Sequence, residues 1–184
     1  MELLLIRHGL PVRREVEDGI ADPELSAAGL AQADHLAEYL RSEPLEAVYA
    51  SPLQRAYQTA LPVAATRGLE VTVVDGVAEW DRNSNSYIPI EELKAAGDPR
   101  YLALMRGEWT TAEETPEQFS ERVVSSIDAL VEQHAGHRIA ISCHGGTINA
   151  YVSHVLGLAP SSGFFYPNYT SVHRVMVSRS RSEE

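Results

Sequence analysis

The chain has 184 residues, a length that fits one domain or one domain with an inserted lobe. Hydrophobic residues make up 44% of it, which supplies a sizeable core and argues against wholesale disorder. The formal net charge of -11 argues against general binding to nucleic acids or anionic membranes, because both favour basic surfaces. A small anionic substrate in a local basic pocket remains compatible with this charge.

Three further features concern the cellular compartment. Cys143 is the only cysteine, so no intramolecular disulfide can form, which fits a reducing compartment. The first apolar run is four residues long and an arginine follows at once, unlike a signal peptide. No stretch approaches the ~18 apolar residues of a membrane span. We therefore expect a soluble cytoplasmic protein with neither a membrane nor a nucleic acid as partner.

The first strand is predicted from four consecutive aliphatic residues, Leu3 to Ile6, which indicate burial on both faces. Arg7, His8 and Gly9 follow, where ligands of open α/β sheets gather. Arginine presents a planar fork for phosphate or carboxylate, and histidine can act as a nucleophile or base near neutral pH. Glycine lets the backbone turn and approach a ligand closely. Alone, this tripeptide is a weak signal, since a strand can simply end in polar residues.

A loop is predicted over residues 10–24. A helix follows, with Ser26 as its N-cap, and Gln32 within it is expected to face solvent. The predicted apolar stripe of this helix is Leu30, Ala33, Leu36, Ala37 and Leu40.

The next segment alternates strand and helix. Residues 47–50 and 71–74 are predicted strands, because they are short, apolar and partly β-branched. The helix between them, residues 53–67, carries Arg55 in its first turn, and Pro52 suits the start of that turn. Strand and helix in alternation indicate a mostly parallel sheet with helices on its faces.

The pattern then changes, and residues 81–114 are predicted to form an insertion over one end of the sheet. Thr115 is the expected N-cap of the next helix. A strand at 138–143, a helix at 147–156 and a last strand at 170–177 complete the chain, and the polar tail after it is expected to fray. The predicted apolar face of the helix after Thr115 is Phe119, Val123, Ile127 and Leu130.

Three polar motifs each lie just beyond a predicted strand, and parallel strands would bring them to one edge of the sheet. That edge would hold two arginines, two histidines, and backbone N–H groups at glycines and helix starts. Such a set suits a phosphoryl group, which takes bidentate arginine contacts, a nucleophile and N–H donors. The motifs span residues 7–9, 51–56 and 142–146.

Together the motifs resemble those of the histidine phosphatase superfamily, which are the phosphoglycerate-mutase-like proteins. Within this superfamily, they resemble the branch 1 phosphatases. The resemblance covers nearly the whole chain. It implies a three-layer α/β/α sandwich with a mostly parallel sheet, as a single domain over 1–184 with a small cap at about 81–114. It rests on RHG at 7–9, LSAAGLAQA at 25–33, SPLQRAYQTA at 51–60, an acidic residue near 79 and CHGG at 143–146.

The resemblance implies a role for each matching residue. His8 would be the nucleophile that becomes phosphohistidine, and Glu79 the general acid that protonates the leaving oxygen. Asp81 lies two residues further on, so either carboxyl group could face the pocket. His144 is also placed among the catalytic residues. The implied phosphate-binding residues are Arg7, Arg55, His144 and Gly145.

Simple chemistry supports these roles. His8 must be neutral to attack phosphorus, and nearby arginines disfavour its protonated form. Cations in the pocket complement charge on the transferring oxygens. A carboxylic acid whose pKa is raised by burial could protonate the leaving alkoxide and then activate water.

Neither a metal ion nor another cofactor is expected. Metal ligation needs histidine and carboxylate side chains that converge on one point. The sequence contains no recognisable motif of this kind. Cys143 is predicted to pack, since no cysteine-phosphatase loop follows it. The remaining histidines considered, which are predicted to be surface or packing residues, are His35, His134, His137 and His154.

Two departures from the family pattern suggest an unusual substrate or a drifted activity. Leu10 and Pro11 stand where many members carry polar residues, and the Trp-Glu-Gly type sequence after the acidic residue is missing. In the insertion, cations could contact a second anionic group and aromatic rings could stack on a substrate, or both sets could be ordinary surface residues. These residues are Arg82, Lys94, Arg100 and Arg106, and Tyr87, Tyr101 and Trp109.

Three functions remain in competition. The leading one is a cofactor-independent phosphomonoesterase, of the histidine acid phosphatase type, acting on a small phosphorylated metabolite. The others are a phosphoglycerate mutase and a catalytically idle binding protein. A short insertion and a seven-residue polar tail after Val177 favour hydrolysis, because a mutase needs an extensive cover to protect its phosphoenzyme from water. The sequence does not decide the substrate or the oligomeric state, for which a homodimer is one option.

Overall fold

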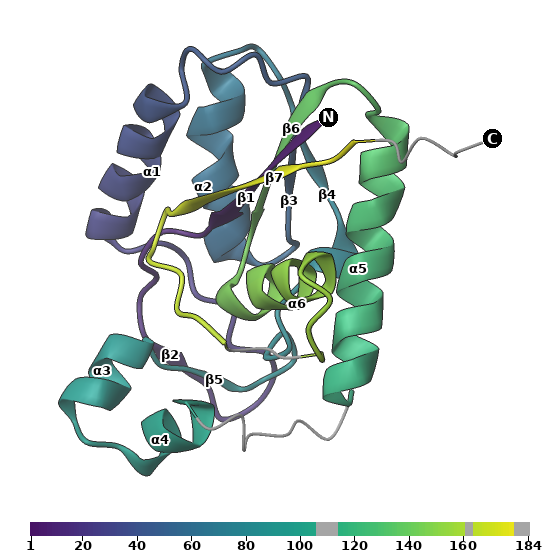
Figure 1. The fold of residues 1–184 in the computed structure, drawn as a ribbon. Helices are drawn as coiled ribbons and strands as arrows, with labels where there is room; N and C mark the ends of the chain where they lie inside the picture. Colours follow the sequence, from purple (N-terminus) through teal and green to yellow (C-terminus); the bar gives the residue numbers. More distant parts are fainter. Residues whose placement is uncertain (106–113, 161–163, 179–184) are drawn as a thin grey trace.

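The computed structural model describes residues 1–105, 114–160 and 164–178. Its centre is a five-stranded sheet in the order β4-β3-β6-β1-β7. Strands β1, β3, β4 and β6 run parallel, and β7 pairs antiparallel with β1 at one edge (Figure 1). The strands are β1 (Glu2–Arg7), β3 (Ala47–Ala50), β4 (Val71–Val73), β6 (Arg138–Cys143) and β7 (Val172–Met176).

Helices cover both faces of the sheet (Figure 1). One face packs on α1 (Ala27–Tyr39) and α2 (Gln54–Ala65). The other packs on α5 (Pro116–Gln133) and α6 (Gly145–Val155). This arrangement confirms the predicted three-layer α/β/α fold with a mostly parallel sheet.

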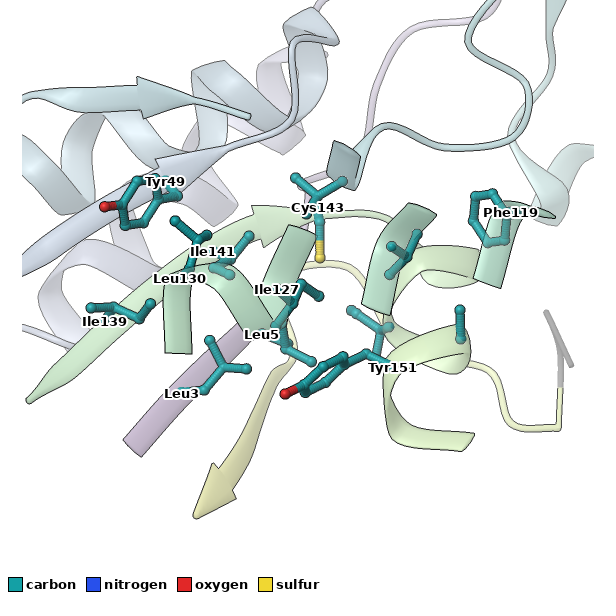
Figure 2. Close-up of a cluster of buried hydrophobic side chains, with 14 residues drawn as sticks. Leu3, Leu5, Tyr49, Phe119, Ile127, Leu130, Ile139, Ile141, Cys143 and Tyr151 are labelled. Carbon is teal, nitrogen blue, oxygen red and sulfur yellow. The ribbon is translucent and has the colours of Figure 1, made fainter. Parts of the chain in front are cut away.

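The core follows from the aliphatic run of β1. Alternate side chains of a strand point to opposite faces, so Leu3 and Leu5 pack toward α5 and α6 while Leu4 packs toward α1 and α2. All three are fully buried. Figure 2 shows the α5 side of this core, where Ile127 of α5 and Tyr151 of α6 lie over the sheet.

Two predicted helix caps are present. Ser26 Oγ accepts a hydrogen bond from Gly29 N–H. Thr115 and Gln118 form a capping box, in which each side chain accepts from the other residue's backbone N–H. Within the described residues, no helix combines the length and the apolar character needed to cross a membrane.

Two predictions for α1 were wrong. Leu30 is 50% exposed and does not belong to the buried stripe. Gln32, expected to be solvated, accepts a hydrogen bond through Oε1 from Leu10 N–H at 2.8 Å. The loop after β1 packs against the start of this helix, because a Cβ on Gly29 would come within 2.1 Å of the Leu10 carbonyl oxygen. The hydrogen bond of Gln32 thus joins α1 to the loop after β1.

Two helix starts also differ from prediction. Helix α2 begins at Gln54 after Leu53 as N-cap, so Pro52 precedes the helix. Helix α6 begins at Gly145, two residues before the predicted start, with His144 as N-cap. The earlier start matters, because the free N–H groups of a helix's first turn then follow β6 directly.

Shorter elements lie beyond the sheet at its carboxyl end (Figure 1). A 3-10 turn, η1, spans Asp75–Val77. Strand β2 (Arg14–Glu15), in a segment predicted to be a loop, pairs antiparallel with β5 (Ser86–Tyr87). Helices α3 (Ile90–Ala95) and α4 (Pro99–Met105) follow.

The predicted limits of the insertion and of the domain remain predictions. Arg106 and Trp109, singled out in the sequence, lie outside the described residues. The same holds for residues 179–184 of the polar tail.

A matched pair of substitutions tests which face of α1 is buried. Leu36 is 4% exposed, so Leu36→Ala should lower the free energy of unfolding by about 2–5 kcal/mol through lost burial and a cavity. Leu30→Ala makes the same chemical change at an exposed position and should change it by less than about 0.5 kcal/mol. Urea unfolding measures both, and equal losses would contradict this packing.

Candidate active site

The three polar motifs do meet at the carboxyl edge of the sheet. The register pairs Arg7 of β1 with Cys143 of β6, and Ala50 of β3 with Ser142 of β6, so the three strands end side by side. The residues that follow these ends are therefore brought together. The predicted site residues Arg7, His8, Arg55, Glu79 and His144 are all buried there.

The ring of His8 is held in one tautomer. Its Nδ1 lies 2.7 Å from the carbonyl oxygen of Gly9. A carbonyl oxygen only accepts hydrogen bonds, so Nδ1 carries the proton and the lone pair is on Nε2. Burial, followed by the positive charges of Arg55 and Arg7, lowers the pKa of His8 well below its ordinary value. A neutral imidazole with a free Nε2 has the form that a nucleophile needs.

Arg55 is held by an acid and an aromatic ring. Its Nη2 donates to Asp81 Oδ1 at 2.9 Å, and its guanidinium carbon lies 4.5 Å from the centre of the Tyr87 ring. Its Nε is buried and has no hydrogen-bond partner within the described part of the chain. Since buried donors are normally paired, this group is suited to an anion.

Arg7 is arranged in a similar way. Its Nη1 donates to the Pro167 carbonyl oxygen at 2.6 Å. Its guanidinium carbon lies 4.0 Å from the ring centre of Tyr169 and 4.7 Å from that of Tyr166. Its Nε is also buried, again without a hydrogen-bond partner among the described residues. The two arginines therefore place cationic charge at the site with donors left over.

His144 lies beside His8, with 5.2 Å between the ring centres. Its Nε2 is 2.7 Å from Ser51 Oγ. Burial and the neighbouring charges, chiefly Arg55, lower its pKa well below the ordinary value. Gly145 begins α6 immediately afterwards, so the positive end of that helix dipole faces the same region.

Glu79 is the buried acid of the site. Its Oε2 accepts from Gly146 N–H at 2.8 Å, and its Oε1 from Trp80 N–H at 3.2 Å. Burial, and then the negative charge of Asp81, raise its pKa to about 7, against the smaller opposing effects of those N–H groups and Arg55. A Cβ at position 146 would come within 2.3 Å of Glu79 Oε1, so any larger residue there would displace the Glu79 carboxyl group.

A cavity of about 370 Å³ opens onto part of this site, and Arg7, His144 and Gly145 are not among its described lining residues. Arg55, Glu79 and Asp81 line it together with His8. The rest of the described lining comes from β5, α3 and α4 and from the segments that precede and join them. These residues are Trp80, Ser84, Ser86, Tyr87, Ile88, Ile90, Leu93, Arg100 and Ala103.

The sequence singled out several insertion residues as possible substrate contacts, and only some of them line the cavity. Tyr87 and Arg100 line the cavity, whereas Arg82, Lys94 and Tyr101 are not among its lining residues. Arg100 also pairs with Asp98, with 2.7 Å between Nη2 and Oδ2.

Sequence reasoning missed a tyrosine pair. The Tyr166 and Tyr169 hydroxyls donate to the two carboxylate oxygens of Glu91 on α3, at 3.0 and 2.9 Å. The Tyr169 ring centre is 5.7 Å from that of His8. The hydrogen bonds to Glu91 link α3 to the segment that carries Tyr166 and Tyr169, on which Arg7 stacks. The only signal in the sequence was the aromatic density of residues 164–169, which has no periodicity.

Comparison with known proteins identifies the family. The sequence model of the histidine phosphatase superfamily (branch 1) matches residues 3–183. The chain belongs to this superfamily. The match confirms the resemblance that the motifs indicated.

Relatives within the histidine phosphatase superfamily include enzymes with several activities. Phosphoserine phosphatase 1 of Hydrogenobacter thermophilus is 40% identical over 97 residues, which cover 50% of this chain and 45% of that protein. The alignment thus spans less than half of that relative. A probable phosphoglycerate mutase of Yersinia enterocolitica is 28% identical over 168 residues, or 87% of this chain and 77% of that protein.

Solved structures of other proteins share the fold. A phosphoserine phosphatase mutant from Entamoeba histolytica, in complex with phosphoserine, superposes with a TM-score of 0.75 at 24% identity, covering 97% of this chain and 91% of that one. A putative alpha-ribazole-5'-P phosphatase from Escherichia coli gives 0.74 at 23% identity, covering 97% and 92%.

The raised pKa of Glu79 makes a prediction about stability. The folded chain keeps a proton up to about pH 7 that the unfolded chain releases near pH 4.5. This contribution to stability is therefore present below pH 4.5 and lost as the pH rises to 7. The free energy of unfolding of the native protein, relative to Glu79→Gln, should fall by roughly 3 kcal/mol over that interval and then level off.

Urea unfolding at several pH values measures this difference. Glu17→Gln, which changes an exposed carboxylate, is the control and should show no such fall. A difference between the native protein and Glu79→Gln that stays constant with pH would contradict a proton on Glu79.

Proposed function

We propose that the chain is a phosphoric monoester hydrolase that acts on a small phosphorylated metabolite through phosphohistidine at His8. The observation that carries this proposal is the neutral His8 imidazole, whose Nδ1 is engaged by Gly9 and whose Nε2 keeps its lone pair beside two buried arginines. Phosphatases among the relatives and structural neighbours agree with it, including a metal-independent phosphoserine phosphatase of Arabidopsis thaliana. A cytoplasmic location is part of the proposal.

The first step transfers the phosphoryl group. His8 Nε2 attacks phosphorus as the bond to the leaving oxygen breaks. Arg7 and Arg55 hold the phosphoryl oxygens and balance their charge, and His144 with the Gly145 N–H at the start of α6 completes that pocket. Glu79 donates its proton to the leaving oxygen, for which a pKa of about 7 is suited.

The second step regenerates the enzyme. The Glu79 carboxylate takes a proton from water, and the water oxygen attacks the phosphohistidine. The phosphorus–nitrogen bond breaks, inorganic phosphate leaves, and neutral His8 and protonated Glu79 are restored. In this scheme the two arginines supply the positive charge, and neutral histidine and backbone N–H groups donate hydrogen bonds.

Hydrolysis is favoured over a phosphoglycerate mutase reaction by the lining of the cavity. A mutase must also hold the substrate carboxylate. Among the described lining residues, Arg100 is the only cation besides Arg55, and it already pairs with Asp98. Apolar side chains, including Ile88 and Leu93, make up much of the rest. Incubation with 3-phosphoglycerate separates the two reactions, since hydrolysis releases phosphate and the mutase reaction yields the 2-isomer.

Removing the nucleophile tests the proposal. His8→Ala should reduce turnover of an activated aryl phosphate close to background, because in this scheme His8 Nε2 is the atom that accepts the phosphoryl group. His35→Ala, at an exposed histidine of α1, should keep full activity. Absence of turnover in the native protein, or turnover preserved in His8→Ala, would contradict the proposal.

The choice of acid is tested by the leaving group. Glu79→Gln should lose ~100- to 10,000-fold in turnover of an alkyl phosphate, whose leaving oxygen needs a proton. The loss should be smaller with an aryl phosphate, whose leaving group is stable as an anion. Asp81→Asn breaks the ion pair to Arg55 and should slow both substrates alike. The opposite pattern in the two variants would assign the acid role to Asp81.

A further inference from the structure

Three potential metal ligands meet at the edge of the sheet opposite the cavity. Glu46 immediately precedes β3, His137 immediately precedes β6, and His134 is the C-cap of α5. Because β3 and β6 are parallel and the active-site residues follow their carboxyl ends, this cluster lies at the amino ends of both strands (Figure 1). At ~3.3 Å per residue, the six residues of β6 separate it from His144 by roughly 20 Å.

The donor atoms of the cluster converge. His134 Nδ1 lies 2.9 Å from Glu46 Oε1, and His137 Nδ1 lies 2.5 Å from Glu46 Oε2. One donor atom from each residue lies within 4.8 Å of the other two. Glu46 and His137 are exposed, whereas His134 is buried. An ion could therefore enter from solvent and meet one side chain that is already fixed.

We propose that Glu46, His134 and His137 bind a divalent transition-metal ion, with Zn²⁺ as the best fit. Two imidazoles and one carboxylate are a ligand set that zinc favours, with water in the fourth position. Ligand atoms ~2.0–2.2 Å from zinc lie somewhat further apart than the hydrogen-bonded distances seen here. The exposed side chains of Glu46 and His137 can open by that amount while His134 stays in place.

A second hydrogen bond supports the assignment. His134 Nε2 lies 2.7 Å from the hydroxyl oxygen of Tyr49, a residue of β3. When Nδ1 binds a metal, Nε2 must carry the proton, and it then donates to that hydroxyl oxygen. Metal-binding histidines are commonly oriented in this way by a partner on the other ring nitrogen.

The bound ion would act as a structural tether. It would join the start of β3 to the turn between α5 and β6, segments that lie far apart along the chain. An ion that binds only the folded state stabilises it by mass action. The sequence gives no local signal of this site, because Glu46 and His134 are 88 positions apart and the two histidines alone form no recognisable metal motif.

Titration with zinc tests the site on the full chain after treatment with EDTA. Calorimetry should show one Zn²⁺ per chain, and the same addition should raise the melting temperature. His137→Ala and Glu46→Gln, both at exposed positions, should each weaken binding at least about tenfold. His154→Ala is the matched control, since His154 is exposed beside the single carboxylate of Asp128. It should leave binding unchanged.

Two further measurements distinguish a metal-binding site from Glu–His ion pairs that bind no metal. Tyr49→Phe keeps the three ligands and most of the packing, and should weaken zinc binding by removing the acceptor for His134. Co²⁺ should give visible absorption typical of low coordination, which His137→Ala should abolish. Stoichiometric binding that is equally strong in His137→Ala, or no binding at all, would overturn the proposal. Turnover of an aryl phosphate should be the same with and without EDTA, so this test is independent of the proposed function.

Discussion

The positive charge of two buried guanidinium groups is the constraint on which the rest of the site depends. Arg7 and Arg55 are 6% and 2% exposed, and within the described part of the chain only Asp81 forms an ion pair with either. Desolvated cations are costly unless they are paired. Stacking on Tyr87 and Tyr169 offsets part of this cost. A bound phosphoryl group would supply the remaining negative charge, which explains why the site suits an anion although the protein as a whole is acidic.

The same charge sets the protonation of the other groups. It acts with burial to keep His8 and His144 neutral. For Glu79 it opposes burial, yet burial and the negative charge of Asp81 prevail, and the pKa rises to about 7. A neutral His8 and a partly protonated Glu79 can therefore coexist near neutral pH. The Gly146 N–H donates to Glu79, so the start of α6, which follows β6, also affects the pKa of this carboxyl group.

The sequence predicted what depends on local pattern. Aliphatic runs located the strands, and the parallel arrangement placed the ends of β1, β3 and β6 together, so that Arg7, His8 and His144 were expected to converge. Their roles remain proposals. Contacts between distant segments could not be predicted in this way, because nothing in the local sequence marks them. Gln32 turns toward the loop after β1, Tyr169 stacks on Arg7, and Glu46 lies against two histidines, in each case through tertiary packing.

The central claim is that the hydrogen bond from His8 Nδ1 to the Gly9 carbonyl oxygen leaves Nε2 as the nucleophile. Rapid acid-free quenching of the protein during turnover, followed by nuclear magnetic resonance of the isolated phosphopeptide, locates the phosphoryl group on one ring nitrogen. The account predicts phosphate on Nε2 of His8, stable in base and labile in acid. Phosphate on Nδ1, or on any other residue, would contradict it.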